Sequence, residues 1–135
     1  MRVTRVLETC LYAEDLAAAA AFYEEILGLE PISSVPGRHV FLRCGDGVLL
    51  LFHPARTEQP GGDVPPHGAR GPGHVAFAVP AEDLPAWPAR LATHAIPLEA
   101  DVTWPRGGRS LYFRDPAGNS VELTTPAIWG ISDVL

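Results

Sequence analysis

The chain has 135 residues, of which 47% are hydrophobic and 19% charged, so it can form one domain with a buried core and is too apolar to be disordered. Its formal net charge of −6 argues against nucleic acid and anionic membranes as partners. All 10 residues of the Lys+Arg total are arginine, and the lack of lysine excludes Schiff-base chemistry and a P-loop.

The chain carries no signal for a membrane or for secretion. No stretch approaches the roughly 20 apolar residues of a transmembrane helix. Residues 1–6 alternate polar and apolar types and do not form the apolar region of a signal peptide, so we expect a cytoplasmic protein. Cys10 and Cys44 lack the spacing of a metal or redox motif, and we expect two reduced thiols.

The first half of the chain predicts one strand, then a helix, then three further strands. We expect the strands over residues 3–12, 31–35, 39–43 and 48–52 and the helix over residues 15–27. The helix follows from apolar residues that recur about every 3.6 positions and from Gly28, which is placed to end it.

A segment rich in glycine and proline separates this half from a similar second half. We assign residues 59–72 to a linker, because such a run suits neither a central strand nor a helix interior. In the second half we expect strands over residues 74–79, 98–103, 110–114 and 120–124 and a helix over residues 84–94. Pro88 predicts that the start of this helix is distorted.

The two halves align as a repeat. Residues 40–43 match residues 111–114, and residues 47–54 match residues 119–126. The sequence therefore predicts an α+β protein made of two tandem βαβββ units, each too small to be stable alone. We assign unit one to residues 1–58, unit two to residues 73–126 and a tail to residues 127–135, all within a single domain 1–135.

Several segments of this repeat match a known family. They are residues 8–16, 22–23 and 26–29 in unit one, and residues 71–79 and 113–123 around unit two. With these segments the chain resembles the vicinal oxygen chelate superfamily, which includes glyoxalase I, bleomycin-resistance proteins, fosfomycin-resistance enzymes and extradiol dioxygenases. The resemblance implies curved mixed sheets around a cavity, with the helices on the outer face.

The resemblance also implies a metal site. Metal-using members take ligands from the first and last strand of each unit, which correspond here to Glu8, His74 and Glu122. Glu8 stands where the family usually has His or Gln, and Leu50 stands where a fourth ligand, often Glu, is found. One imidazole and two carboxylates suit a divalent Zn, Mn, Fe, Co or Ni ion, with positions left open for water or substrate.

The alternation of side chains along the strands supports the same assignment. Successive strand residues point to opposite faces of a sheet. If Glu8, His74 and Glu122 face a cavity, small or polar residues join them on that face. The apolar residues between them then pack under the helices, and for the first strand these are Leu7, Thr9 and Leu11.

Further candidates lie around this face. Tyr112 shares the cavity parity and is a candidate for proton donation beside Glu122, although core packing explains it as well. The candidate substrate-binding residues are Arg109 in an arginine-rich turn, Trp104 before it, Trp129 in the apolar tail, and Phe41. His67 in the linker and His94 at a helix end are expected to have no specific role.

Two classes of function fit these residues. The first is a divalent-metal-dependent enzyme that acts on a small oxygen-chelating substrate, of lyase, isomerase, thiol transferase or dioxygenase type. The second is a metal-free, bleomycin-resistance-like protein that binds a cationic small molecule in an acidic, aromatic groove at a dimer interface. The resemblance and the open edges of the expected sheets also predict a homodimer.

Overall fold

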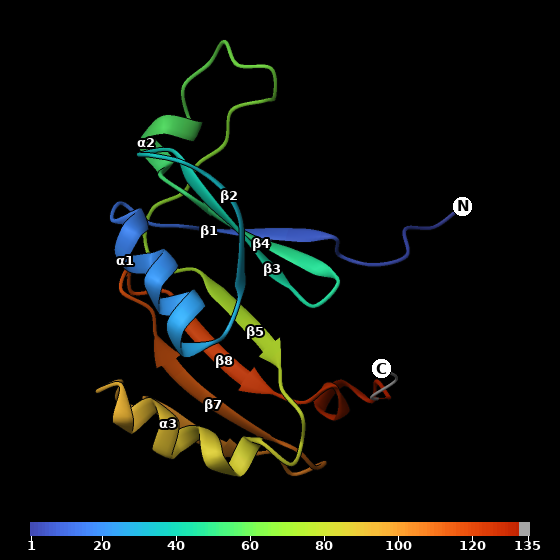
Figure 1. The fold of residues 1–135 in the computed structure, drawn as a ribbon. Helices are drawn as coiled ribbons and strands as arrows, with labels where there is room; N and C mark the ends of the chain where they lie inside the picture. The colour runs from blue at the N-terminus through green and yellow to red at the C-terminus, as the bar shows by residue number, and fades with distance from the viewer. Residues whose placement is uncertain (133–135) are drawn as a thin grey trace. The chain divides into compact units, whose positions relative to one another are not determined.

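The computed structural model describes residues 1–132 of the chain, so the last part of the predicted tail, residues 133–135, lies outside the described residues. The chain divides into two compact units, with the boundary between Gly73 and His74. Each unit holds one four-stranded sheet and its own helices (Figure 1). Within the described residues no helix is long and apolar enough to cross a membrane.

The first unit contains the elements β1 (Glu8–Tyr12), α1 (Leu16–Ala21), η1 (Phe22–Ile26), β2 (Glu30–Val35), β3 (His39–Cys44), β4 (Gly47–Phe52) and α2 (Pro54–Thr57). The second contains β5 (His74–Ala78), η2 (Leu84–Ala86), α3 (Trp87–Thr93), β6 (Ala100–Thr103), β7 (Arg109–Arg114), β8 (Ser120–Thr124) and η3 (Pro126–Trp129). The predicted α+β class and the βαβββ order of both units are confirmed.

The two sheets have the same topology. The strand order is β1-β4-β3-β2 in the first unit and β5-β8-β7-β6 in the second. In each unit the first strand pairs in parallel with the last, and the remaining pairs are antiparallel. The helix that follows the first strand makes this parallel pairing possible, because parallel neighbours need a long crossover connection.

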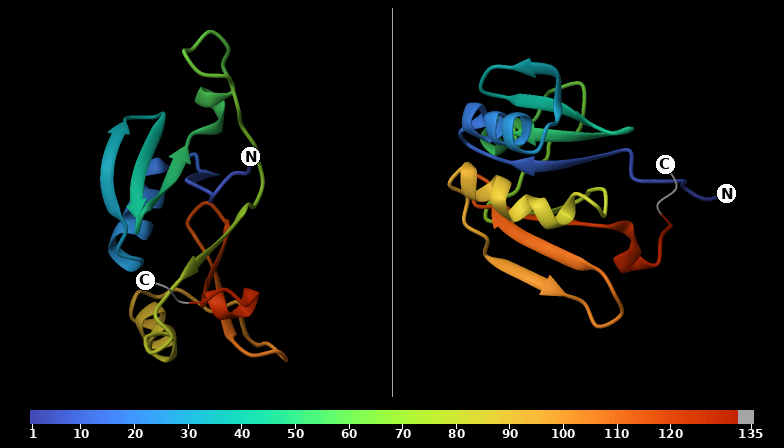
Figure 2. Two further views of the ribbon diagram at one scale, coloured as in Figure 1. Left: turned by 90° about the vertical axis from the view of Figure 1, so that its right-hand side faces the viewer. Right: turned by 60° about the horizontal axis from the view of Figure 1, so that its bottom comes forward.

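One face of each sheet forms the core. In the first sheet Leu42, Leu49 and Leu51 are at most 2% exposed, and α1 packs on β3 and β4. In the second sheet the equivalent buried side chains are Leu111, Phe113, Val121 and Leu123, and Figure 2 shows α3 running beside this sheet. In the first sheet the residues between the buried leucines lie on the opposite face, which is open to a pocket, whereas on β8 Glu122 and Thr124 of that face are buried as well.

The first strand differs from its prediction. It begins at Glu8, and the residues before it are exposed and not paired as a strand. Leu7 is 59% exposed and Thr9 is exposed, so the expectation that both pack under a helix is wrong, whereas Leu11 is buried as expected. The reason is that α1 lies over β3 and β4 and not over the start of β1.

The helices differ from their predictions in two details and confirm a third. The first helix begins after Asp15, whose side chain accepts a hydrogen bond from the Ala18 amide at 3.0 Å, but its second half, η1, is π-helical. The predicted distortion at the start of the second helix is confirmed, because η2 is a 3-10 helix and Pro88 falls in the first turn of α3, where it is tolerated. The short helix α2, which His53 caps through its ring nitrogen, was not predicted.

A buried turn fixes the start of β8. The Asp115 carboxylate accepts hydrogen bonds from the amides of Ala117 and Asn119 at 3.0 and 2.8 Å, and from the Asn119 side chain at 2.9 Å. Backbone donors that are satisfied by a carboxylate hold a turn more firmly than neutral acceptors do. The turn therefore sets the direction in which β8 leaves and, with it, the place of Glu122.

The tail of the second unit packs on the β6–β7 hairpin at Gly108. A Cβ added to Gly108 would lie 2.5 Å from the Ile128 side chain, and Gly107 and Gly108 both have positive φ angles, of +102° and +93°. We expect Gly107→Ala to lower the free energy of unfolding by about 1 kcal/mol through backbone strain alone. We expect Gly108→Ala to cost about 1–3 kcal/mol more, because it adds an overpacked contact.

Urea unfolding of the two variants measures this difference. The double variant Gly108→Ala/Ile128→Ala should recover stability relative to Gly108→Ala alone, because it removes the crowded methyl group. Equal stabilities of Gly107→Ala and Gly108→Ala would contradict the packing of the tail on the hairpin.

Candidate functional site

The strand registers show which positions of the two units are equivalent. Glu8 pairs with Val48 and His74 pairs with Ser120, each at the start of a parallel pair. Two residues further along the last strand lie Leu50 in the first unit and Glu122 in the second. The alignment made from the sequence is therefore the structural one, with Glu8 in the place of His74 and Leu50 in the place of Glu122.

In the second unit His74 and Glu122 come together. They lie on the neighbouring strands β5 and β8, and His74 Nε2 is 3.3 Å from Glu122 Oε2. The Glu122 side chain is 8% exposed, and no arginine pairs with it within residues 1–132. A buried carboxylate is costly unless a positive charge compensates it.

The hydrogen bond of the other ring nitrogen, Nδ1, determines the tautomer and the orientation of the His74 imidazole. His74 Nδ1 is 3.1 Å from the carbonyl oxygen of Ser120, which can only accept, so Nδ1 donates. In a neutral imidazole Nε2 then directs its lone pair at the Glu122 carboxylate, and two lone pairs repel. A positive charge shared by the two atoms would remove this repulsion, so the pair has the geometry of two donors to one cation.

The donor set fits a divalent metal. Ligand atoms that each lie about 2.1 Å from one ion are about 3.0–3.4 Å apart at octahedral or tetrahedral angles. The observed 3.3 Å between Nε2 and Oε2 falls within this range. The hydrogen bond from Nδ1 to a backbone carbonyl is the support that ligating histidines usually have.

Tyr112 lies beside this pair on β7. It is the cross-strand neighbour of Glu122, and its ring stacks near that of His74 with centroids 6.4 Å apart. Burial, together with the negative charge of Glu122, raises the pKa of Tyr112 above its usual value. The phenol therefore stays protonated at neutral pH and can donate a hydrogen bond next to Glu122.

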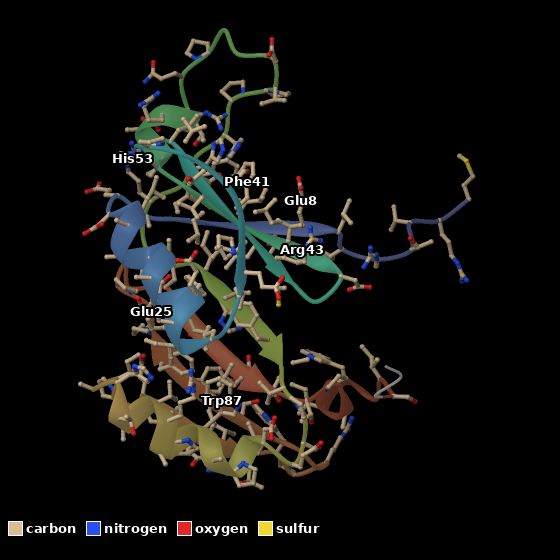
Figure 3. All side chains as sticks on the ribbon, viewed as in Figure 1. Glu8, Glu25, Phe41, Arg43, His53 and Trp87 are labelled. Carbon is tan, nitrogen blue, oxygen red and sulfur yellow. The ribbon has the colours of Figure 1, made fainter. Side chains whose placement is uncertain are left out.

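Glu8 belongs to the first unit. It is exposed at the start of β1, and Figure 3 labels it together with Phe41 on the first sheet. Within residues 1–132 no three His, Cys, Asp or Glu side chains form a ready metal cluster. The third ligand that the sequence assigns to Glu8 is therefore a proposal, whereas the contact between His74 and Glu122 is observed.

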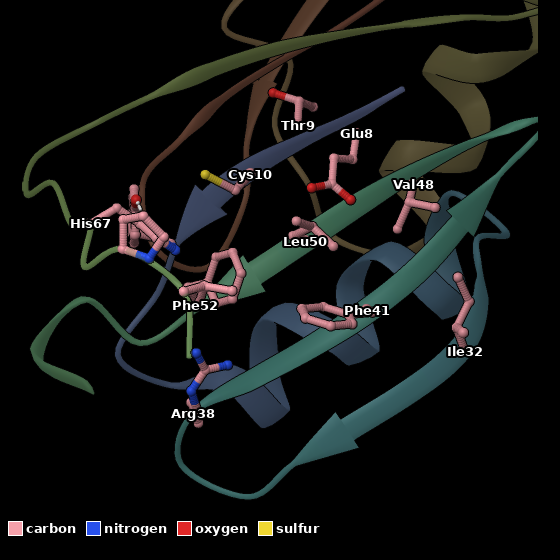
Figure 4. Close-up of a pocket in the computed structure, with 13 residues that line it drawn as sticks. Glu8, Thr9, Cys10, Ile32, Arg38, Phe41, Val48, Leu50, Phe52 and His67 are labelled. Atoms are coloured by element: carbon pink, nitrogen blue, oxygen red, sulfur yellow. Dashed lines mark hydrogen bonds between the residues drawn. The ribbon is translucent and has the colours of Figure 1, made fainter. Parts of the chain in front are cut away.

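The first unit has a pocket of about 860 Å³ over its sheet. Glu8 lines one part of it, and Phe41, Leu50 and Phe52 line the middle (Figure 4). The helix α1 lies on the opposite face of these strands. Phe41, predicted to bind substrate, thus lies in a pocket wall.

The linker contributes a residue that the sequence analysis dismissed. His67 lines the pocket, and its Nδ1 is hydrogen-bonded to the Tyr12 hydroxyl at 2.5 Å. Its ring also meets the edge of Phe52, with centroids 4.7 Å apart. The expectation that His67 has no specific role is therefore wrong, and a linker without periodicity offers no signal that could have placed it.

The remaining candidates lie elsewhere in the second unit. Arg109 makes a two-point ion pair with Asp101, at 2.8 and 2.7 Å, so a role as substrate clamp would require this pair to open. The Trp104 indole donates to Ser110 Oγ at 2.8 Å, which ties the hairpin to the sheet. Trp129 is 78% exposed. Substrate binding by these three residues stays a prediction.

Arg38 is a second pocket residue that the sequence analysis missed. It precedes β3, and its Nη1 donates to His39 Nδ1 at 2.6 Å. Burial, followed by the charge of Arg38, lowers the pKa of His39, so His39 is the neutral acceptor in this contact.

This contact predicts a measurable change in titration. Arg38→Gln removes the positive charge that disfavours the imidazolium, so the pKa of His39 should rise toward its ordinary value while burial still holds it below that value. Histidine NMR signals followed against pH measure the change. The control Arg2→Gln alters an exposed N-terminal charge and should leave the His39 curve in place. An unchanged His39 curve in Arg38→Gln would contradict the contact.

Comparison with known proteins agrees with this geometry. The sequence model of the Glyoxalase/Bleomycin resistance protein/Dioxygenase superfamily matches residues 5–123 of this chain. A solved structure described as lactoylglutathione lyase from Agrobacterium tumefaciens is 41% identical, covers 97% of this chain and 100% of its own, and has a TM-score of 0.93.

More distant structures share the fold. A glyoxalase/dioxygenase from Nostoc punctiforme is 25% identical over 90% of both chains, with a TM-score of 0.67. A glyoxalase/bleomycin resistance protein/dioxygenase from Nocardioides is 22% identical over 93% of this chain and 85% of its own, with a TM-score of 0.73. The chain therefore belongs to the glyoxalase/bleomycin resistance protein/dioxygenase superfamily.

Proposed function

We propose that this protein is a divalent-metal-dependent enzyme that acts on a small substrate with two neighbouring oxygen atoms. The observation that carries the proposal is the buried Glu122 carboxylate, which has no arginine partner within residues 1–132 and faces His74 Nε2 at 3.3 Å. Such a pair fits an ion better than it fits an apolar core.

The proposed ligands are Glu8, His74 and Glu122, and the proposed ion is Zn, Mn, Fe, Co or Ni. Glu8 is included because it occupies the strand position that His74 occupies in the other unit. A bound ion of this kind supplies a Lewis acid that polarises substrate oxygens. His74 is oriented for ligation through its Nδ1 contact with the Ser120 carbonyl.

The protein's own acid–base groups favour a lyase or isomerase type of reaction. Leu50 offers no base at the position equivalent to Glu122, so Glu122 and Tyr112 are the proposed acid–base groups. Tyr112, protonated beside Glu122, donates a hydrogen bond to an oxygen on which negative charge develops. The similarity to a protein described as lactoylglutathione lyase supports this reaction type.

The proposed ligand set of two carboxylates and one histidine differs from the set of two histidines and one carboxylate in non-haem iron oxygenases. This difference disfavours a dioxygenase reaction.

The alternative is a metal-free protein that binds a small molecule. The observation that favours it is the pocket of the first unit, whose middle is apolar and aromatic and contains no ligand pair. Metal analysis of protein purified without added metal separates the two functions, because only the first requires stoichiometric metal.

The metal site predicts a clear order of effects in titrations with Zn²⁺, Ni²⁺ and Mn²⁺. His74→Ala and Glu122→Gln should each weaken binding at least about 100-fold, because each removes a ligand. Glu8→Gln keeps an oxygen but loses the charge, and we expect a loss of about tenfold with the fold intact. Affinity should fall as pH decreases, since the proton competes for the same atoms. Isothermal titration calorimetry measures all three effects.

Matched controls come from exposed residues of the same types. His94→Ala and Glu82→Gln lie outside the proposed site and should bind metal as the wild type does. Unchanged metal binding in Glu122→Gln would refute the site. Unchanged binding in Glu8→Gln alone would leave the metal on His74 and Glu122 and would remove Glu8 from the ligand set.

We further propose that the protein is a homodimer. All six residues of the edge strand β2 are exposed, including Ile32 at 45% and Val35 at 43%. Open strand edges with apolar side chains are normally covered. Light scattering at micromolar concentration should give twice the 14.5 kDa chain mass, and a mass of a single chain there would contradict the proposal.

A further inference from the structure

We infer that the pocket of the first unit binds a flat aromatic molecule with an anionic group, such as an aromatic carboxylate, with its ring over Phe41 and Phe52 and its anion at Arg38. The inference names the substrate class of the proposed enzyme and rests on the proposed function for what then happens to the ligand. The binding step itself uses no metal ion, so it can be tested separately.

The first support is the change in chemistry between equivalent positions of the two sheets. The site face of the second unit carries Tyr112, Glu122 and Thr124, and the registers place Phe41, Leu50 and Phe52 at the same three positions of the first unit. Three polar side chains of one unit thus correspond to three apolar ones in the other, two of them aromatic. This face of the first unit is built to contact an apolar surface.

The second support is the geometry of the rings. Phe41 and Phe52 meet edge to face, with centroids 5.6 Å apart and planes at 80°. The His39 ring stacks on Phe41 at 4.0 Å, and the His67 ring meets Phe52 at 72°. These contacts hold the rings in fixed orientations, and rings held at right angles offer both a face and an edge to a flat guest.

The third support is an arginine without a carboxylate. Arg38 lines the pocket and lies 5.8 Å from the centre of the Phe52 ring, and within residues 1–132 no carboxylate pairs with it. His39 occupies one donor of the Arg38 guanidinium, which leaves further N–H groups for an anion.

The opposite charges of Arg38 and Glu8 determine which end of the ligand lies at which end of the pocket. Glu8 lines the pocket beside Val48, whereas Arg38 directly precedes His39, the partner of Phe52. Val48 and Phe52 are four residues apart on β4, or roughly 13 Å. Figure 4 labels both Arg38 and Glu8 in the pocket wall. A ligand anion is attracted to Arg38 and repelled by Glu8. The aromatic body therefore spans the middle, and the far end of the ligand lies nearest Glu8.

The same features disfavour two other ligand classes. A cationic aromatic molecule would meet the unpaired charge of Arg38 against the Phe52 ring. A strongly polar peptide such as glutathione would lose its hydration against Phe41, Leu50 and Phe52 without polar partners there.

The test uses matched ligands on the full-length protein in the presence of EDTA. The three naphthalene probes are naphthalene-2-carboxylate, the neutral 2-naphthalenemethanol and the cationic 2-naphthylmethylamine, and glutathione is the polar probe. Titration calorimetry should rank the carboxylate tightest and the amine weakest of the three. Arg38→Gln should weaken the carboxylate about tenfold and leave the alcohol unchanged, since a charge-assisted hydrogen bond is lost. The control Arg2→Gln removes a positive charge at the exposed N-terminus and should leave the binding of both the carboxylate and the alcohol unchanged.

A second variant tests the ring contact. Phe41→Leu should weaken the carboxylate and the alcohol alike, by about three- to tenfold, and thermal unfolding shows whether the variant is folded. Tightest binding of the amine or of glutathione would overturn the inference, as would equal carboxylate binding by wild type and Arg38→Gln. Because no metal is present, these outcomes do not depend on the metal titrations, so the two proposals can fail separately.

Discussion

The parallel pairing of the first and last strand of each unit is the constraint on which the site depends. In the second unit this pairing sets Ala76 opposite Glu122 and puts His74 one diagonal step away on the same face. At that spacing the two side chains meet at 3.3 Å without distortion of either strand. The Asp115 turn fixes the start of β8, and Tyr112 on β7 lies beside Glu122 as its neighbour across the other strand pair.

The feature of this geometry that matters chemically is the buried carboxylate of Glu122. At the equivalent position of the first unit stands Leu50, which is half-buried and lines the pocket, whereas the Glu122 side chain is only 8% exposed. A carboxylate kept there without an arginine partner within residues 1–132 costs free energy, and the group that faces it is the His74 imidazole at 3.3 Å.

The two units use one fold for two kinds of surface. The second unit presents an imidazole, a carboxylate and a phenol, and the first presents aromatic rings with Arg38 and Glu8 in the same pocket wall. In both units the core face stays apolar, with buried residues such as Leu49 and Val121, while the residues on the opposite face differ in chemistry.

The sequence by itself determined the order of the main strands and helices, the repeat and the strand face that His74 and Glu122 share, but not the short helix α2 or the start of β1. These features are local, because strand alternation and helix periodicity are properties of neighbouring residues. Only the tertiary structure decided that Leu7 and Thr9 are exposed, since this depends on which strands α1 covers. It also brought His67 to Tyr12 and Arg38 to Phe52. Those contacts come from a linker and a turn, whose side chains follow no period and are placed only when the sheet has formed.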